Sequence, residues 1–372
     1  MSTPHVLVDG LVLFNTMGGA LLYARETLPR CARLLHERGG RLSLLIAGAE
    51  RSKNWAQELA DAEHLHLQFV DAPMRPALRR AWSEPRAVQA AIEENAALGR
   101  AVQVLQTQSL PIPRLPFDGV QIHLCHGLRR LHTGRPLARQ FTRSLLRRGA
   151  RNLHSMVTVS NALSSELNEL LPGLALHCIS PGADHRIALP RDPSKPQHVI
   201  CLGPTDPHKN HALLASSWAT DPSLPPLRIH AQPGEDITAT IKKHGQQDRI
   251  TWHAPLMETA FAGALATCSA LLLPSRLESF GMVALEALHA GAPLAISDLP
   301  SHREIVGGAR DQVAFFDPTS PTDAAQAVAQ ALLLDTPESR IQRQHRAAEF
   351  TWHGTAQRTV DHWCAASPTT TS

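Results

Sequence analysis

The sequence lacks several patterns that mark common classes of protein. Its six cysteines are widely spaced and include no C-x-x-C pair, which argues against a zinc ribbon, a thioredoxin-like redox site and a disulfide-stapled secreted domain. The N-terminal segment MSTPHVLVDG has neither the basic start nor the apolar stretch of a signal peptide. Wholly apolar runs are only a few residues long, too short to span a membrane. We therefore expect a cytoplasmic protein.

An excess of one charge sign is also absent. The chain has 36 basic residues (Lys+Arg) and 33 acidic ones, a net charge of +3, so its global charge does not mark a nucleic-acid binder. Only five of the 36 basic residues are lysines, which leaves 31 arginines, so a lysine inside a motif is informative. With 372 residues, of which 43% are hydrophobic, the chain is long enough for two domains with their own cores.

Short apolar runs alternate with helical stretches along the whole chain, which is typical of βαβ units. The runs are nearly continuous rather than alternating, as expected for parallel strands covered on both faces. A segment with four prolines, 181–197, separates two such series. We therefore predict an α/β fold of two doubly wound, Rossmann-like lobes, with a ligand site in the cleft between them. The predicted strands are 5–9, 42–47, 66–70, 102–106, 119–124, 155–159, 198–203, 227–231, 249–253, 270–274, 292–296 and 313–316.

The segment 270–308 is the most informative part of the sequence. A buried strand leads through Glu278 and Gly281 into a predicted helix over 282–290, which Gly291 closes. The free N–H groups of the first helical turn, together with the helix dipole, predict a site for an anion such as a diphosphate. Glu278 and Glu286 are placed to accept hydrogen bonds from sugar or ribose hydroxyls. The competing explanation is that Glu278 is a helix N-cap and Glu286 a solvated helix residue.

The pair of glutamates belongs to a longer pattern, P-S-x-x-E-S-F-G-x-x-x-L-E-A-x-x-x-G-x-P-x-x-x-S-D. This string resembles the E-x7-E signature of the GT4-type retaining glycosyltransferases, which have the GT-B fold. The resemblance implies that Glu278 contacts the donor sugar, that Glu286 contacts the nucleotide ribose, and that backbone N–H groups hold the donor phosphate. The matched positions are Pro274, Ser275, Glu278, Phe280, Gly281, Glu286, Ala287, Gly291, Pro293, Ser297 and Asp298, and the phosphate-binding backbone would be that of Phe280, Gly281, Met282 and Val283.

A second segment, 201–210, is similar to the strand and loop in which the family places a lysine on the donor diphosphate, here Lys209. Family members often have an arginine where this chain has Pro204-Thr205. They also often have a basic residue at the position that His208 occupies here. The form G-x-x-x-P-x-K-N is similar to members that use GDP-mannose. This resemblance makes GDP-mannose the expected donor.

Two weaker matches lie in the first half of the chain. Gly18-Gly19, between the first strand and a predicted helix over 20–28, resembles the glycine loop on the acceptor and phosphate side, although such a pair is usually only a turn. His126 stands where the family has a histidine that contacts the donor sugar, followed by Gly127 where an aspartate is common. The competing explanation for His126 is a satisfied histidine at a strand end.

The resemblance also sets the expected domains and activity. Phe350-Thr351-Trp352 resembles the turn before the helix that GT-B chains send back over the first lobe. The expected domains are 1–185 on the acceptor side, 186–345 for the nucleotide sugar, the returning helix 346–366 and a disordered tail 367–372. The expected activity is that of a retaining, metal-independent hexosyltransferase with no cofactor, whose co-substrate is a nucleotide sugar and whose acceptor is a glycan or lipid-linked sugar.

Other functions of the same architecture stay open. The departures at Pro204-Thr205 and Gly127 also suit a catalytically degenerate protein that binds a nucleotide sugar, and an epimerase or phosphorylase can share the fold. A nucleotide-dependent dehydrogenase is disfavoured because no G-x-G-x-x-G follows the first strand. We name no catalytic base, because the leaving phosphate itself can take the acceptor proton.

Two further groups of residues are candidate sites. His123, Cys125, His126 and His132 include metal-ligand types, but adjacent residues of a strand face opposite ways, so we expect no metal. The stretch 119–165 has eight arginines and no acidic residue. The competing explanation is a solvated helix face, but a basic stripe here predicts peripheral contact with an anionic membrane. The stripe consists of Arg135, Arg139, Arg143, Arg147 and Arg151.

Overall fold

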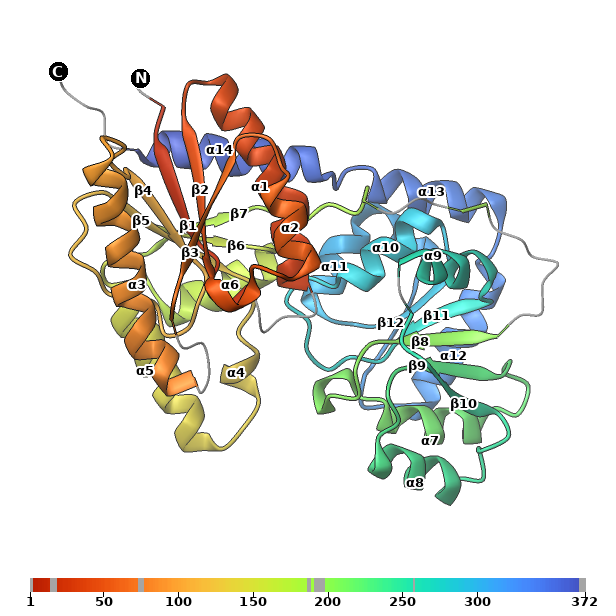
Figure 1. The fold of residues 1–372 in the computed structure, drawn as a ribbon. Helices are drawn as coiled ribbons and strands as arrows, with labels where there is room; N and C mark the ends of the chain where they lie inside the picture. The colour runs from red at the N-terminus through yellow and green to blue at the C-terminus, as the bar shows by residue number, and fades with distance from the viewer. Residues whose placement is uncertain are drawn as a thin grey trace. The chain divides into compact units, whose positions relative to one another are not determined.

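The computed structural model describes residues 3–13, 19–72, 77–185, 189–190, 198–256 and 258–367. The chain divides into two compact units (Figure 1). The first consists of Met1–Gly182 and Trp352–Ser372, and the second of Ala183–Thr351. Of the predicted tail, residues 368–372 lie outside the described part of the chain, as does Gly18 of the predicted glycine loop.

The first unit is built on a parallel sheet of seven strands in the order β3-β2-β1-β4-β5-β6-β7. Apolar side chains of the central strands, such as Leu7, Leu45 and Leu105, form a core with Val88 and Ala91 of helix α3. The strands are β1 (His5–Asp9), β2 (Arg41–Ala47), β3 (Leu65–Val70), β4 (Val104–Thr107), β5 (Val120–Cys125), β6 (Ser155–Thr158) and β7 (Ala175–Cys178).

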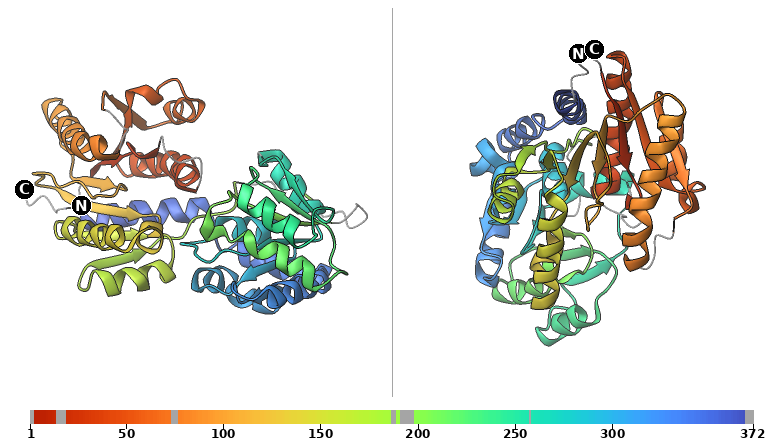
Figure 2. Two further views of the ribbon diagram at one scale, coloured as in Figure 1. Left: turned by 90° about the horizontal axis from the view of Figure 1, so that it is seen from below. Right: turned by 90° about the vertical axis from the view of Figure 1, so that its left-hand side faces the viewer.

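Helices lie on both faces of this sheet (Figure 2). Helix α14 comes from the far end of the sequence but packs against α1, so residues more than 300 positions apart share one core (Figure 1). The helices are α1 (Gly19–Glu37), η2 (Gly48–Glu50), α2 (Asn54–Ala60), α3 (Ala77–Ala97), α4 (Arg129–His132), α5 (Pro136–Ala150), α6 (Asn161–Leu170) and α14 (Trp352–Ala366).

The second unit has a parallel six-stranded sheet in the order β10-β9-β8-β11-β12-β13. Helices α7 and α12 pack together, while α10 packs against α13, α11 and α9. The strands are β8 (Val199–Leu202), β9 (Leu227–His230), β10 (Ile250–His253), β11 (Ala270–Leu273), β12 (Leu294–Ser297) and β13 (Ala314–Phe316). The helices are η3 (Pro207–Lys209), α7 (Ala212–Thr220), α8 (Glu235–Lys243), α9 (Glu258–Thr267), α10 (Met282–Ala290), α11 (Pro300–Val306), η4 (Gly307–Gln312), α12 (Pro321–Leu333) and α13 (Pro337–Ala347).

The predicted α/β fold with two doubly wound lobes is confirmed. Each of the twelve predicted strands is present, with ends shifted by at most two residues. The sequence did not predict strand β7. Its sequence, ALHC, alternates between exposed and half-buried residues because it lies at the edge of the sheet, so it lacks the continuous apolar run of a central strand.

Helix α1 is also longer than predicted. The sequence suggested a helix over 20–28, ahead of Pro29, but α1 continues through this proline to Glu37. Cys31 and Leu35 are fully buried beyond the proline. Their burial outweighs the local cost of a proline in a helix, about 3 kcal/mol. Among the described residues, no helix combines the length and apolar character that a membrane crossing requires.

Buried histidines predict that acid destabilises the protein. Burial lowers the pKa of His123 to about 3 and that of His211 to about 4, so both are neutral in the folded state at neutral pH. In the unfolded chain they titrate near 6.5, so stability is full above that pH and is lost as the pH falls towards the folded pKa. At pH 5 each should cost about 2 kcal/mol of unfolding free energy.

Urea unfolding at pH 7.5 and pH 5.0 measures this loss. The matched variant is His123→Gln, whose side chain does not titrate in this range. It should lose about 2 kcal/mol less than the wild type on acidification. Equal losses in the two proteins would contradict the assignment to His123.

Candidate functional site

The predicted site residues of the second unit follow its two central strands, β8 and β11. From β8 the chain moves to β9 on one side, and from β11 it moves to β12 on the other side. The loops after these two strands therefore diverge, and such a switch point at the carboxyl ends of parallel strands is where doubly wound sheets bind ligands. Lys209 follows β8, and Glu278 follows β11.

The side chain of Asn210 fastens these loops together. Its backbone has a left-handed conformation with a φ of 59°, which ends η3 directly after Lys209. The side-chain amide donates to the carbonyl oxygens of Pro274 at 3.0 Å and Pro318 at 2.8 Å. The backbone N–H of Arg276 adds a 2.8 Å hydrogen bond to the His208 carbonyl. The motif in the sequence contained Asn210 but gave no sign of this role.

Lys209 and Glu278 form a largely buried ion pair. The Lys209 Nζ donates to Glu278 Oε1 at 2.6 Å, and the Ser275 hydroxyl donates to the same oxygen at 2.7 Å. Burial alone would raise the pKa of Glu278, but the Lys209 and His302 side chains and these hydrogen bonds hold it below its usual value. Glu278 is therefore ionised at neutral pH. The competing view of Glu278 as a helix N-cap is wrong, because Gly281 is the N-cap of α10.

Helix α10 begins as predicted, at Met282, and its N-terminus carries no side-chain cap from residue 281. Gly281 has a φ of 109°, a left-handed conformation that favours glycine. The preceding Phe280 is buried and packs edge-on against Phe350, with ring centroids 6.0 Å apart. This packing fixes the turn, so the first-turn N–H groups of α10 point in a defined direction.

Glu286 is buried rather than solvated. It lies in the second turn of α10 with 4% of its surface exposed, so the competing explanation of a solvated helix residue is wrong. Its Oε1 is 3.0 Å from Nε2 of His185, which is also largely buried. Nothing in the sequence pointed to His185 as the neighbour of this glutamate.

In the first unit, His126 lies just beyond the end of β5. Its Nε2 is 3.1 Å from Oε1 of Gln108, whose amide nitrogen donates to the Asp9 carbonyl at 3.0 Å. This arrangement orients Gln108 as the acceptor, so His126 donates through Nε2. Its ring also packs edge-on against Tyr23 at 5.4 Å. Burial lowers the pKa of His126 to about 4, so it is neutral at physiological pH. Gly19 is the first residue of α1.

The histidines that could serve as metal ligands in the first unit have other partners. Nδ1 of His123 is 3.0 Å from the Thr107 hydroxyl, and Nε2 of His132 is 2.6 Å from Oε1 of Glu166. In the described ranges, no group of three or more histidine, cysteine, aspartate or glutamate side chains is arranged to hold a metal ion.

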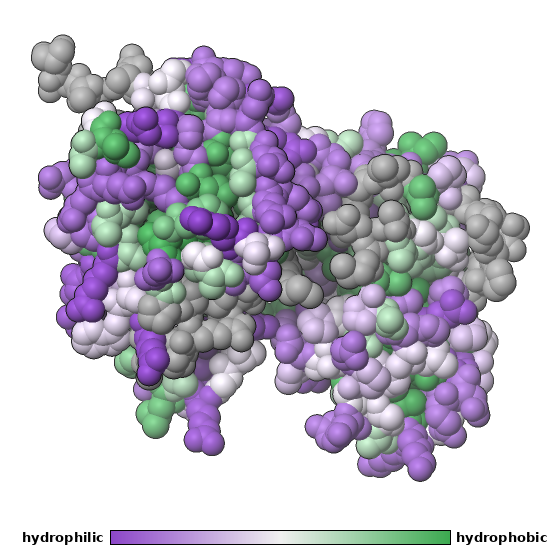
Figure 3. Space-filling view, in the orientation of Figure 1, coloured by the Kyte–Doolittle hydropathy of each residue, from purple (hydrophilic) through white to green (hydrophobic). Residues whose placement is uncertain are grey.

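The basic stripe divides between two sides of α5. Leu146, Gly149 and Ala150 face the body of the unit, and Arg139 lies toward that side and is half-buried. Arg143 and Arg147 are exposed, as is Arg148. Two apolar residues, Leu137 and Phe141, form the outer face of α5 with Arg148 and are 80% and 65% exposed. Figure 3 shows hydrophobic and hydrophilic side chains side by side at the lower end of the first unit, over α5.

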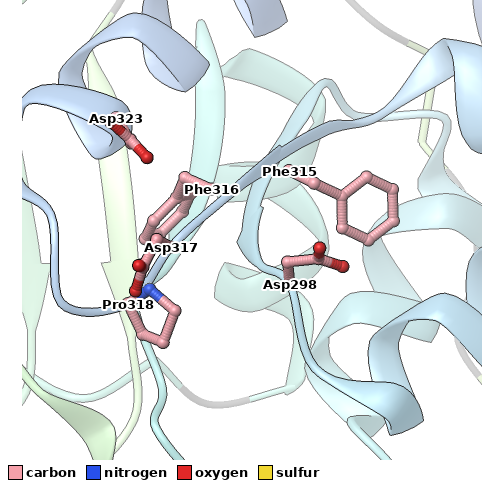
Figure 4. A pocket seen from close by; sticks show the side chains of 6 residues that line it. All are labelled: Asp298, Phe315, Phe316, Asp317, Pro318 and Asp323. Carbon is pink, nitrogen blue, oxygen red and sulfur yellow. The ribbon is translucent and has the colours of Figure 1, made fainter.

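Two pockets lie in the second unit. One, of about 430 Å³, lies beyond the ends of β12 and β13, where Phe315 and Phe316 point to opposite sides of the strand (Figure 4). Its acidic residues have local partners: Asp298 pairs with Arg303, and Asp317 accepts from Thr319. The other, of about 590 Å³, is lined by parts of the loops after β8, β9 and β11, including Thr205, His211, Gly234 and Arg276.

Comparison with known proteins shows a similarity to one enzyme family. Residues 189–349 match the family model described as "Glycosyl transferases group 1". This part of the chain is therefore similar to the group 1 glycosyltransferases. The match contains Lys209, Glu278, Glu286 and the start of α10, so the resemblance stated from the sequence is confirmed.

The chain is also similar to curated proteins that are named as sugar-transferring enzymes. The chain is 31% identical over 242 residues to a glycogen synthase of Mycobacterium tuberculosis, covering 58% of this chain and 55% of the relative. It is 25% identical over 228 residues to the MMP alpha-(1->4)-mannosyltransferase of Mycolicibacterium hassiacum, covering 58% and 54%. The chain spans about half the length of these curated relatives.

The fold extends beyond this domain. The structure of Anabaena HepE in complex with UDP-glucose resembles the chain with a TM-score of 0.71 at 13% identity, covering 97% of this chain and all of HepE. At this identity the likeness concerns the fold, which is the GT-B fold of the group 1 glycosyltransferases.

The turn at Gly281 predicts a sharp response to a single methyl group. A Cβ at this position would lie 3.1 Å from both His302 Cδ2 and Ile305 Cδ1, in addition to the strain of a φ of 109°. Gly281→Ala should therefore destabilise the protein by about 1–3 kcal/mol. The matched control is Gly263→Ala in helix α9, where a Cβ would meet no atom within 4 Å. Thermal unfolding of both variants tests this, and an unchanged midpoint for Gly281→Ala would show that the turn tolerates a side chain.

Proposed function

We propose that this protein transfers a hexose from a nucleoside diphosphate sugar to a glycan or lipid-linked sugar, with retention of anomeric configuration. The observation that carries the proposal is the cluster of Lys209, Glu278 and the uncapped N-terminus of α10 at the switch point of the second sheet. A cation and a helix N-terminus suit a diphosphate, and a carboxylate beside them suits sugar hydroxyls.

In this proposal each group has a defined task. Lys209 and the first-turn N–H groups of α10 hold the diphosphate and neutralise the charge that develops as it leaves. Glu278, which is ionised, accepts hydrogen bonds from donor hydroxyls, and Glu286 binds the ribose. The first unit supplies His126, whose ring Gln108 orients through the Nε2–H bond, and the glycine loop with Gly18 and Gly19 on the acceptor side. The proposal assigns no task to a metal ion, so we expect turnover to persist in EDTA.

The proposed donor is GDP-mannose. The form G-x-x-x-P-x-K-N supports it, as does the similarity to a mannosyltransferase of Mycolicibacterium. The fold that the chain shares with HepE, which was solved with UDP-glucose, makes a UDP-sugar the alternative to be tested beside it.

Nucleotide binding should be visible as thermal stabilisation. A diphosphate at 100 times its dissociation constant should add about 2.7 kcal/mol of stability, so we expect GDP to raise the unfolding midpoint more than UDP, ADP, dTDP or CDP. Lys209→Met should remove most of this shift because it removes the cation that faces the phosphate. The same change at the exposed Lys243 is the matched control.

Turnover separates an enzyme from a degenerate binder. Release of GDP from GDP-mannose in the presence of candidate acceptors, followed by proton NMR of the product anomer, tests transfer and retention together. Stabilisation by a nucleotide without turnover of any sugar donor would favour the degenerate binder. No stabilisation by any diphosphate would overturn the proposal.

We further propose that the outer face of α5 contacts an anionic membrane. Leu137 and Phe141 are exposed beside Arg148, and Arg143 and Arg147 are exposed on the flank of the same helix. A helix surface with arginines and large apolar residues suits the interface of an acidic bilayer. This placement would bring the protein to a lipid-linked acceptor.

Sedimentation with vesicles tests the membrane contact. Binding to vesicles that contain phosphatidylglycerol should exceed binding to neutral vesicles and should fall with salt. Leu137→Ser combined with Phe141→Ser should weaken binding without a change in net charge, and Arg143→Glu with Arg147→Glu should abolish it. Exchange of the exposed Leu333 on α12 for serine is the control. Undiminished binding by both double variants would contradict the proposal.

A further inference from the structure

Several buried side-chain nitrogens of the second unit have no hydrogen-bond partner in the described part of the chain, and one of them lies beside the start of α10. It is Nε2 of His302, a fully buried residue of α11. The other ring nitrogen, Nδ1, lies 2.8 Å from the Ser297 carbonyl oxygen and so carries the proton that is donated to it. A buried polar atom without a partner costs about 1–3 kcal/mol, and this cost calls for a functional reason.

The unpartnered edge of the ring lies against the turn that begins α10. A Cβ on Gly281 would be 3.1 Å from Cδ2 and 3.4 Å from Nε2 of His302. The ring is thus directly behind the helix N-terminus to which the proposed function assigns the donor diphosphate. Two independent observations coincide at this point: a helix N-terminus whose N-cap residue, Gly281, has no side chain, and a buried unpartnered nitrogen beside it.

The charges around the ring determine its state. Burial lowers the pKa of His302 and has the largest effect; Lys209 lowers it further, whereas Glu278 and Asp298 raise it, as does the hydrogen bond to Ser297. The balance leaves the pKa below its usual value, so the ring is neutral at pH 7. The ammonium group of Lys209, which contributes to the charge at this ring, is already paired with Glu278. A bound diphosphate would thus add negative charge that this pair does not offset.

We propose that His302 is a second cationic group of the donor site, neutral in the free protein and protonated at Nε2 when a diphosphate occupies the N-terminus of α10. The proton comes from solvent, and no covalent bond is made or broken. The imidazolium keeps its Nδ1–H bond to Ser297 and directs Nε2–H toward the turn. This inference rests on the proposed function and deepens it, because it predicts that nucleotide binding is coupled to proton uptake through His302, which acts as a positioning residue.

Calorimetry measures that coupling directly. Titration of the full chain with GDP and with UDP at pH 7.0, in buffers of different ionisation enthalpy, gives the number of protons taken up per nucleotide. The matched variant is His302→Asn, whose amide can still donate to Ser297 but does not titrate. The wild type should take up about one proton more than the variant. For each pH unit, the Kd of the wild type should therefore change by up to about tenfold more than the Kd of the variant. The nucleotide's own phosphate titration is common to both proteins and cancels in the comparison.

The outcomes are distinct. If the nucleotides bind both proteins with equal proton uptake, His302 does not have this role, although the proposed function stands. If neither nucleotide binds the wild type, the proposed function fails and this inference fails with it. Should the variant not fold, nitrogen-15 NMR of histidine-labelled wild type replaces it. One of the 21 imidazoles should then change from the neutral form to the doubly protonated form on saturation with nucleotide. Absence of any such change overturns the proposal.

Discussion

The geometry of the second unit depends on the two hydrogen bonds of the Asn210 amide. They reach the Pro274 and Pro318 carbonyls, at the ends of β11 and β13, from a residue that follows β8. One buried side chain thereby joins the loops that follow β8, β11 and β13, and Lys209 beside it pairs with Glu278. A left-handed φ is needed at this position, and asparagine is the non-glycine residue that tolerates it while supplying two N–H donors. Glycine would permit the turn without these bonds.

The C-terminal end of α10 is also fixed by hydrogen bonds from one buried side chain. Gly291 ends the helix in a left-handed conformation, and the fully buried Arg343 donates from Nε and Nη2 to its carbonyl and from Nη1 to those of Gln312 and Leu334. A buried guanidinium is stable only when its donors are used, and these carbonyls use them. The helix whose N-terminus is assigned to the diphosphate is therefore fixed at its other end, so its first-turn N–H groups are preorganised for a ligand.

The sequence predicted the repeating elements well because central parallel strands require continuous apolar runs and helix α10 has glycine at both ends. It did poorly wherever burial overrides local preference. Strand β7 is an edge strand, α1 continues through Pro29, and Glu286 is buried in spite of its charge. The partners of the site residues could not be predicted either. Contacts such as His185 with Glu286 join residues about 100 positions apart, and only the folded chain brings them together.

The departures from the family pattern are best judged by charge. Pro204-Thr205 supplies no cation where relatives often have arginine, and the pairing of Lys209 with Glu278 cancels the charge that remains. A diphosphate would thus meet helix N–H groups and little net positive charge. Either the site binds nucleotides weakly, as a degenerate binder would, or another group supplies the missing cation once the ligand arrives. A neutral imidazole held beside Gly281 satisfies the second condition without burying an unpaired charge in the empty site, which would cost far more than an unpartnered nitrogen.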